Sequence, residues 1–357
     1  MRRLPIYFVI DISESMVGEQ MQLVEEGMAS IVKELKTDPY ALETAWVSII
    51  VFAGQAKTLV PLQEIVTFYP PKFPVGSGTS LSKALGHLMF ELRSNIVKTT
   101  ADRKGDWKPI IFLFTDGVPT DETKAAIAEW KQNWQRSANF VAISLGSDAD
   151  TKLLGELTEN VLLLKNTTPA AYKEFFKWVT ASIKVSSVSV ESNGSGFELA
   201  KLEGGEIEKV DTSKLPQQSQ MVDPNYVVIA GKCQNTKRPY LMKYRKTLSA
   251  SGISDFQTLS YKLVGAFQVD NTYYELSDSS SGSKQKINTE ELIGSPTCPC
   301  CGNQIAFAMC SCGEIHCLSF EEIDPKSSQQ STCPSCGNTG KYGMADGGGF
   351  DVNRTQG

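Results

Sequence analysis

Residues 5–15 read PIYFVIDISES, an apolar run that ends in an acid and two serines. A continuous apolar run of this kind is typical of a central parallel strand that is covered on both faces. Open α/β sheets bind their ligands at the carboxyl ends of such strands. Asp11, Ser13 and Ser15 therefore stand where a cation site is expected, and Asp11 is predicted to be its centre.

The pattern of this first strand is repeated along residues 1–185. Apolar runs alternate there with segments of helical periodicity, which predicts a doubly wound α/β domain with a mostly parallel, Rossmann-like sheet. The further predicted strands are 45–52, a shorter one near 57–62, 109–114, 140–145 and 161–164.

The rest of the chain divides by composition. Residues 186–222 are rich in Ser, Gly and Gln and are predicted to be a linker. Residues 223–294 form a β-rich region without a recognisable fold, in which Thr272–Leu276 is one of the strand-like runs. A cysteine-rich, zinc-ribbon-like module is expected over 295–340, followed by a flexible tail, 341–357.

Charge and hydropathy limit the classes of partner. The net charge is -5, with 35 Lys and Arg against 40 Asp and Glu, so no broad basic field would attract nucleic acid or anionic lipid. No apolar run approaches the roughly 20 residues of a membrane span. The N-terminus lacks the features of a cleavable signal. A cytoplasmic protein without membrane attachment is expected.

Three separate segments supply oxygen ligands to the same predicted edge of the sheet. Asp11, Ser13 and Ser15 follow the first strand, Thr79 lies in the glycine-rich sequence GSGTS, and Asp116 follows the strand at 109–114. Carboxylates and hydroxyls suit Mg²⁺, and Mn²⁺ or Ca²⁺ are alternatives. DxSxS alone would equally be a strand end followed by a helix cap. The three segments in order favour the metal site.

DISES, GSGTS and FTDG, in this order, resemble the metal-ion-dependent adhesion site (MIDAS) of von Willebrand factor A (vWA) domains. The resemblance implies that Ser13, Ser15 and Thr79 bind the ion directly. It implies that Asp11 and Asp116 act directly or through water. An ion held mainly by neutral hydroxyls keeps an open position that an Asp or Glu of a partner protein can fill.

Glu14 departs from the resemblance, because small residues are common at this position of the motif. A carboxylate here bears on the shape of the first turn and on the charge balance of the site.

The cysteines are concentrated near the C-terminus, since eight of the nine lie between Cys298 and Cys336. Cys298 and Cys301, and Cys333 and Cys336, form two Cys-x2-Cys-Gly knuckles. Paired knuckles are typical of zinc, and their four thiolates are predicted to hold one ion. A second ion is the alternative, with Cys312 and Cys317 as additional or exchanged ligands. A disulfide framework does not suit a protein without a secretion signal.

The cysteine-rich sequence CPCCGNQIAFAMCSCGEIHC, downstream of a vWA-like domain, resembles the TerY group of tellurite-resistance and chemical-stress proteins, whose tail carries a metal-binding domain. The resemblance implies action beside a PP2C-type phosphatase and a serine/threonine kinase. These two proteins are the partners expected to reach the MIDAS ion.

The expected function is a non-enzymatic, metal-dependent protein-interaction module. One alternative is a nucleic-acid-binding zinc-ribbon protein that uses a basic cluster interleaved with Tyr240 and Tyr244. Another is a magnesium phosphohydrolase with Asp11 as nucleophile, although Ser13 stands where such chemistry usually has a second acid. The basic cluster comprises Lys237, Arg238, Lys243, Arg245 and Lys246.

Overall fold

The chain forms two units, and each is described by itself. The computed structural model describes residues 2–102, 104–146, 149–192, 199–202, 205–210, 225–250, 257–277, 285–318, 329–342 and 349–355. The first unit comprises Met1–Ile12, Glu19–Phe73 and Thr79–Met221. The second comprises Ser13–Gly18, Pro74–Gly78 and Val222–Gly357.

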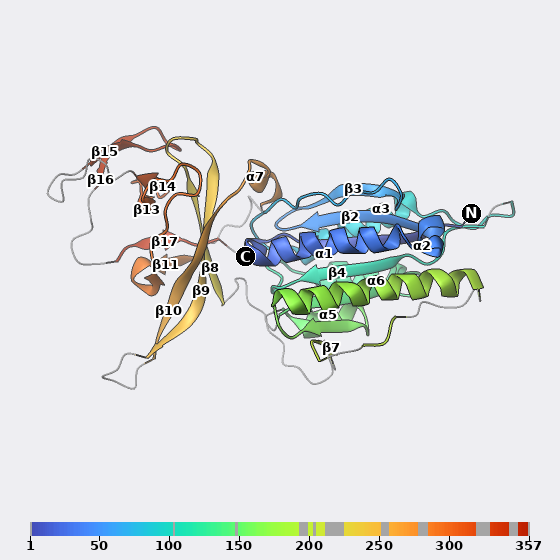
Figure 1. The fold of residues 1–357 in the computed structure, drawn as a ribbon. Helices are drawn as coiled ribbons and strands as arrows, with labels where there is room; N and C mark the ends of the chain where they lie inside the picture. The colour runs from blue at the N-terminus through green and yellow to red at the C-terminus, as the bar shows by residue number, and fades with distance from the viewer. Residues whose placement is uncertain are drawn as a thin grey trace. The chain divides into compact units, whose positions relative to one another are not determined.

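The first unit is built on a seven-stranded sheet in the order β3-β2-β1-β4-β5-β6-β7 (Figure 1). The strands β1, β2, β4, β5 and β6 run parallel, while the edge strands β3 and β7 are antiparallel to their neighbours. The chain therefore has the mixed α/β fold with a mostly parallel sheet that the sequence predicts. The bounds are β1 Leu4–Asp11, β2 Ala45–Phe52, β3 Ala56–Glu64, β4 Ile110–Thr115, β5 Asn139–Leu145, β6 Val161–Leu164 and β7 Ile207–Lys209.

Helices cover both faces of this sheet, so the central strands are buried on both sides, as their unbroken apolar sequences require. The helices α1, α2 and α6 lie on one face, and α3, α4 and α5 lie on the other (Figure 1). Their bounds are α1 Glu19–Leu35, α2 Pro39–Thr44, α3 Leu81–Asn95, α4 Lys124–Asn133, α5 Thr151–Leu157 and α6 Pro169–Ser192.

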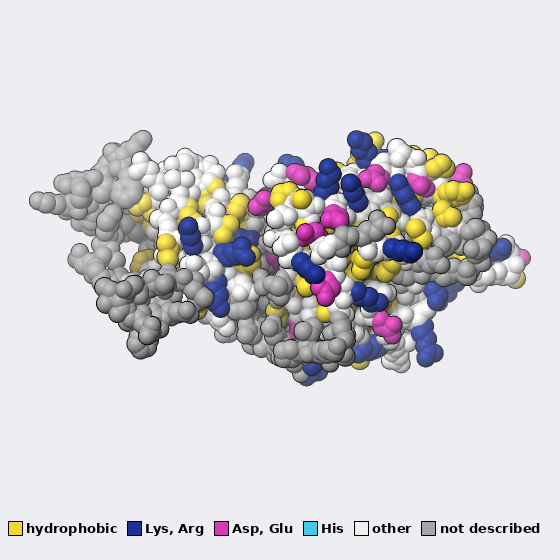
Figure 2. All heavy atoms as spheres, turned by 60° about the horizontal axis from the view of Figure 1, so that its bottom comes forward, with side chains coloured by type: hydrophobic (Ala, Val, Ile, Leu, Met, Phe, Trp, Pro, Cys, Tyr) yellow, Lys and Arg dark blue, Asp and Glu magenta, His cyan; other side chains and the backbone are white. Residues whose placement is uncertain are grey.

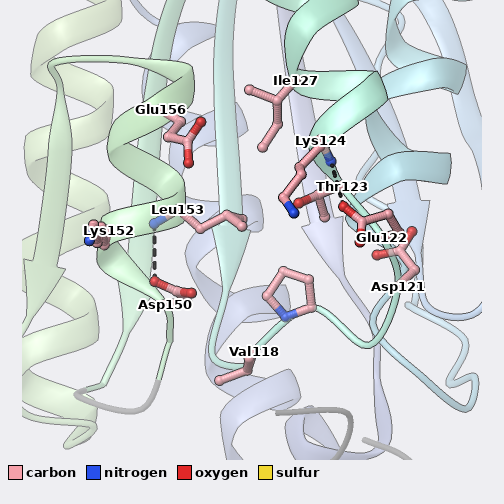
Figure 3. A pocket seen from close by; sticks show the side chains of 11 residues that line it. Val118, Asp121, Glu122, Thr123, Lys124, Ile127, Asp150, Lys152, Leu153 and Glu156 are labelled. Atoms are coloured by element: carbon pink, nitrogen blue, oxygen red, sulfur yellow. Dashed lines mark hydrogen bonds between the residues drawn. The ribbon is translucent and has the colours of Figure 1, made fainter. Parts of the chain in front are cut away.

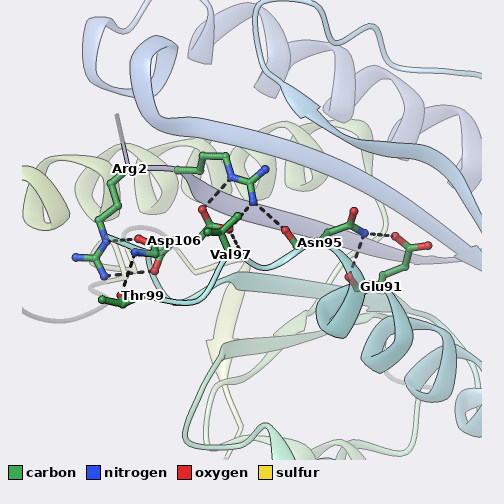
Figure 4. Close-up of polar contacts among 8 residues, drawn as sticks. Arg2, Glu91, Asn95, Val97, Thr99 and Asp106 are labelled. Carbon is green, nitrogen blue, oxygen red and sulfur yellow. Dashed lines mark hydrogen bonds and ion pairs between the residues drawn. The ribbon is translucent and has the colours of Figure 1, made fainter. Parts of the chain in front are cut away.

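The amino end of β1 is fastened by two arginines (Figure 4). Arg3 Nε donates to Asp106 Oδ1 at 2.8 Å, and Asp106 Oδ2 accepts from the Val97 amide at 2.8 Å. Arg2 Nε donates to the Gly105 carbonyl at 2.6 Å. These bonds hold the loop between α3 and β4 against the edge of the sheet from which β1 starts.

The second unit contains a six-stranded sheet in the order β12-β10-β9-β8-β14-β13 and two small antiparallel pairs, β11 with β17 and β15 with β16. The short 3-10 helix η1, Glu14–Met16, belongs to this unit. The other bounds are β8 Tyr226–Lys232, β9 Pro239–Ala250, β10 Gln257–Gln268, α7 Thr272–Leu276, β11 Lys286–Asn288, η3 Thr289–Glu291, β12 Leu292–Ile293, β13 Ile305–Met309, β14 Ile315–Leu318, β15 Gln329–Thr332, β16 Thr339–Tyr342 and β17 Asp351–Asn353.

The zinc-ribbon-like module contains a hairpin of β13 and β14, which pair antiparallel. The hairpin does not stand alone, because β14 also pairs in parallel with β8. The cysteine-rich module and the β-rich region before it therefore share one sheet.

Three expectations differ from the structure. Thr272–Leu276 was expected to be a strand but is the helix α7, in which Tyr273 and Leu276, three residues apart, are both buried. The predicted linker, 186–222, contains the end of α6 and the strand β7, which pairs with β6. The predicted tail, 341–357, contains β17, which pairs with β11. Other parts of the linker and tail lie outside the described residues.

Within the described residues, none of the helices has the length and apolar character needed to span a bilayer.

Candidate metal centres

Asp11 is the last residue of β1, at the carboxyl edge of the sheet. The parallel register pairs Ile10 with Phe114, which brings Asp11 to the end of β4. There the Thr115 hydroxyl donates to Asp11 Oδ2 at 2.6 Å. Asp11 is fully buried. A buried carboxylate is costly unless hydrogen bonds or a cation balance its charge.

Thr79 and Asp116 belong to the same edge of the first unit, and both are buried. A β carbon built on Gly117 would lie 3.7 Å from Thr79 Oγ1, so the threonine hydroxyl lies against the backbone directly after Asp116. The structure thus brings together Asp11, Thr79 and Asp116, three residues that are far apart in the sequence.

Ser13 and Ser15 follow Asp11 closely along the chain, Ser13 as the residue before η1 and Ser15 within it. Their hydroxyl oxygens are 2.9 Å apart, and both residues are buried. The backbone turn is closed by a hydrogen bond from the Met16 amide to the Ser13 carbonyl at 3.0 Å. The two hydroxyls therefore lie side by side because of the 3-10 turn, since β1 ends at Asp11 and the extended strand does not continue through Ser15.

The chemistry of this donor set fits a hard divalent cation. Two carboxylates and three hydroxyls offer oxygen ligands alone, which is what Mg²⁺ prefers, and Mg²⁺ usually keeps several waters as well. Only two of the five groups carry a charge. A bound ion would be held in the first unit by Asp11, Thr79 and Asp116, and the resemblance to the MIDAS motif adds Ser13 and Ser15. Such an ion would retain positive charge for a further anionic ligand.

The sequence reasoning missed the residues that position Thr79. The Thr79 amide donates to Thr120 Oγ1 at 3.0 Å, and the Thr120 amide donates to the Thr79 carbonyl at 2.9 Å. Next to this pair, Asp121 accepts from the Leu81 and Ser82 amides, each at 3.0 Å, and so caps the start of α3. The signal was the run of polar residues after FTDG, in TDGVPTD.

A pocket of about 300 Å³ lies beside this edge, between the starts of α4 and α5 (Figure 3). Val118 lines it, two residues after Asp116. Two of its carboxylates cap helices, because Asp150 Oδ1 accepts from the Leu153 amide at 3.0 Å and Asp121 caps α3. The positions of these two acids are explained by the helix ends that they cap.

Eight cysteines of the second unit gather in two groups of four, and within each group the sulfur atoms lie within 4.8 Å of one another. Four thiolates at this separation fit a tetrahedral zinc site. The first group is Cys233, Cys298, Cys301 and Cys317, and the second is Cys310, Cys312, Cys333 and Cys336.

This grouping corrects the prediction of one ion held by Cys298, Cys301, Cys333 and Cys336. The two knuckles lie in different groups, and each is completed by cysteines from elsewhere. Cys317 and Cys312, expected as additional or exchanged ligands, are full members of the first and second group respectively. The physical reason is the sheet, because β14 pairs with β8 and thereby carries Cys317 to the end of β8, next to Cys233.

Cys233 was the cysteine that the sequence reasoning left out. Its turn has the backbone bonds of a knuckle: the Lys237 amide donates to the Cys233 carbonyl at 3.0 Å, and the Cys233 amide donates to the Arg238 carbonyl at 2.8 Å. The Cys298 turn shows the same pattern, from Gly302 to Cys298 at 2.9 Å and from Cys298 to Asn303 at 2.7 Å.

The fifth residue of each turn has a positive φ, 78° at Gly302 and 59° at Lys237. Glycine adopts this backbone conformation readily, whereas Lys237 is the only non-glycine with a positive φ among the described residues. The turn at Cys233 was not recognised from the sequence because it lacks the second cysteine and the glycine of the Cys-x2-Cys-Gly pattern.

The environment of Cys233 favours the thiolate. Burial acts to raise its pKa, but hydrogen bonds, foremost those from Thr236, outweigh burial and lower the pKa to about 7. A thiolate is the form that binds zinc.

The basic cluster does not form the surface that nucleic-acid binding needs. Tyr240 and Tyr244 are buried in the apolar core of the second unit, where their rings cannot stack on bases. Lys243 is also buried, at 3% exposure. In the first unit, basic and acidic side chains are interspersed on the face that Figure 2 shows on the right.

Two family models match the chain. Residues 6–177 match the family model of the von Willebrand factor type A domain, and the chain is therefore a vWA-domain protein. Residues 223–357 match the TerY-C metal binding domain, so the cysteine groups lie in a domain of a metal-binding family. The chain combines a vWA domain with a TerY-C domain. A comparison with curated proteins gives no significant match.

Several solved structures match part of the chain at low sequence identity and low TM-score. Proximal thread matrix protein 1 from the mussel byssus, solved with a zinc-occupied MIDAS motif, is 18% identical, with a TM-score of 0.37 over 52% of this chain and 46% of that chain. The ArnB paralog VWA2 from Sulfolobus acidocaldarius is 12% identical, with a TM-score of 0.38 over 78% and 70%. The PilB minor pilin from Streptococcus sanguinis is 14% identical, with a TM-score of 0.38 over 51% and 61%. The match spans less than half of the mussel protein.

Proposed function

We propose that this protein is a non-enzymatic interaction module that binds a partner through a divalent cation at the carboxyl edge of the first unit. The observation that carries the proposal is the convergence of Asp11, Thr79 and Asp116, all buried, at the ends of β1 and β4 and at the start of α3. Ser13 and Ser15 add two further oxygens.

The partner is proposed to supply an Asp or Glu side chain. A carboxylate from outside gains both a bond to the ion and electrostatic stabilisation, because neutral hydroxyls leave part of the ionic charge unbalanced. Mg²⁺ is the proposed ion, and Mn²⁺ or Ca²⁺ could take its place.

The thiol groups are proposed to bind two zinc ions that hold the second unit together. Following the TerY resemblance, the protein would act in the cytoplasm, in a chemical-stress signalling system of the tellurite-resistance type. The proposed partners are the PP2C-type phosphatase and the serine/threonine kinase of that system.

The test is metal-dependent capture of a purified partner on immobilised full-length protein. Binding should need Mg²⁺ and fail with Thr79→Ala, while Thr67→Ala, at an exposed threonine in the turn after β3 that is no predicted ligand, should bind as wild type does. Magnesium-free buffer is preferable to a chelator, because chelators also remove zinc. Equal capture by wild type and Thr79→Ala, with and without Mg²⁺, would contradict the proposal.

A further inference from the structure

The segment Ser13–Gly18, called the serine segment below, is held by three kinds of contact within the second unit. The first is apolar, since Val17 packs in a buried cluster with Val228, Leu241, Val269 and Tyr273. The other two involve charged side chains that are themselves buried, Glu14 at 0% exposure and Lys243 at 3%.

Glu14 is the residue that departs from the usual form of the DxSxS motif. One of its carboxylate oxygens, Oε1, accepts a hydrogen bond from the Tyr273 hydroxyl of α7, and the other, Oε2, accepts from Ser77 Oγ at 3.2 Å. Burial, and then the nearby Glu14 carboxylate, raise the pKa of Tyr273 well above its ordinary value. The tyrosine therefore stays protonated and remains a donor at any ordinary pH.

Lys243 reaches the backbone of the same segment from β9. Its ammonium group donates to the Ser15 carbonyl and, at 3.2 Å, to the Val17 carbonyl. The ammonium also lies 4.5 Å from the centre of the Tyr226 ring. These carbonyls lie at the end of η1, where a cation is favoured and where no further turn of helix would satisfy them.

The contacts of Glu14 and Lys243 restrict the conformation of the serine segment more than apolar packing alone would. A buried carboxylate and a buried ammonium each cost free energy unless their bonds are made, so the segment is favoured in the one conformation that makes all of them. Ser13 and Ser15 flank Glu14 directly. A change in the backbone at Glu14 would turn both hydroxyls away from their common direction.

We propose that Glu14, Tyr273 and Lys243 form a clamp that fixes the serine segment, and that this clamp sets the affinity of the cation site to which Ser13 and Ser15 contribute. The inference rests on the proposed function, since it takes both serines as ligands of the ion. Tyr273 and Lys243 are positioning residues, because they act on the ion through the serine segment. Residues more than 220 positions away in the sequence would then tune the MIDAS.

The first measurement needs no magnesium. In the zinc-loaded full chain without Mg²⁺, amide hydrogen exchange is followed at Met16 and Val17, whose amides donate to Ser13 and Glu14. Tyr273→Phe, which removes one oxygen atom, and Lys243→Met should each speed this exchange about tenfold or more. The matched controls are Tyr274→Phe and Lys246→Met, both at exposed side chains of the same elements, and they should leave it unchanged.

The second measurement is calorimetric titration of Mn²⁺ into the same proteins. The clamp predicts a Kd raised about tenfold by Tyr273→Phe and by Lys243→Met and unchanged by the controls. Unchanged exchange in a folded Tyr273→Phe protein would overturn the clamp, and faster exchange with an unchanged Kd would overturn its role in cation binding. If wild type itself bound no Mn²⁺, the proposed function would fail, and the exchange rates would still decide whether the clamp exists.

Discussion

The oxygen site of the first unit and the thiol sites of the second unit gather metal ligands in opposite ways. Asp11, Thr79 and Asp116 stand at the ends of elements that are already fixed by a large apolar core, including Tyr7, Phe52 and Trp130. Cys233, Cys298 and Cys317, in contrast, are themselves members of the core of the second unit. The ligands of the oxygen site lie at the ends of elements whose apolar core forms without them. The cysteines of the thiol sites, in contrast, are part of the core of the second unit.

This difference predicts which region needs its metal to fold. The strands of the cysteine-rich module have five residues or fewer, and segments of this size rarely bury enough apolar surface to fold without a metal or disulfides. Structural zinc contributes about 10–16 kcal/mol of apparent binding free energy in small zinc domains.

The largest expected effect is therefore that of zinc removal. A strong chelator should unfold residues 295–342 while the first unit keeps its structure. Amide exchange should become fast at β13 to β16 and stay slow at β1 and β4. Retention of protected amides in the module after complete zinc loss would show that the module folds without zinc. Unfolding of both units together would show that the first unit also depends on zinc.

Substitution of single cysteines tests which residues hold each zinc ion. Cys233→Ser should reduce the zinc count from two to one, because it removes a ligand of the first group only. Cys300→Ser is the matched control, since Cys300 belongs to neither group and should leave both ions bound. Native mass spectrometry counts the ions. Two zinc ions in Cys233→Ser would show that Cys233 is no ligand.

A smaller effect is expected at Asp121, which fixes the start of α3 beside Thr79. Asp121→Asn weakens the charge-assisted bonds to the Leu81 and Ser82 amides, which should raise the Kd for Mn²⁺ roughly tenfold, about 1–2 kcal/mol. Glu122→Gln, at an exposed neighbour, serves as control. A Kd that is the same in both variants would show that Thr79 does not depend on this cap.

The smallest effect on the cation site is expected from the opposite edge of the sheet. Asp106→Asn should lower the free energy of unfolding of the first unit by about 1–3 kcal/mol, because the Arg3 guanidinium loses its charged partner. The Kd for Mn²⁺ should not change. Asp102→Asn, at an exposed side chain of the same loop, should change neither quantity. A weaker Mn²⁺ affinity in Asp106→Asn would mean that the cation site depends on contacts at the opposite edge of the sheet.

The two regions also differ in how far the sequence predicts them. The apolar runs of the first unit determine its strands, so β2 and β6 have the predicted bounds, and the ligands follow from the rule that strand ends meet at one edge. The contacts that fix those ligands, such as Thr120 with Thr79, were not predictable, because their residue types are common in any loop.

The second unit was predicted less well because its partners come together through sheet pairing. Knuckle spacing identifies cysteines that lie near each other in the chain, but it does not say which knuckles share an ion. The pairing of β8 with β14 decides this, and it joins residues more than 80 positions apart in the chain. Likewise, Thr272–Leu276 has strand-forming residue types, yet the two bonds from Thr272 to the side chain of Asp270 start a helix.

The most direct measurement of the central claim is calorimetric titration of Mg²⁺ or Mn²⁺ into zinc-loaded, full-length wild type and Asp11→Ala. Wild type should bind one divalent ion and Asp11→Ala none, with two zinc ions and the same fold retained in both proteins. Equal binding of the ion by wild type and Asp11→Ala would contradict the assignment of the cation site.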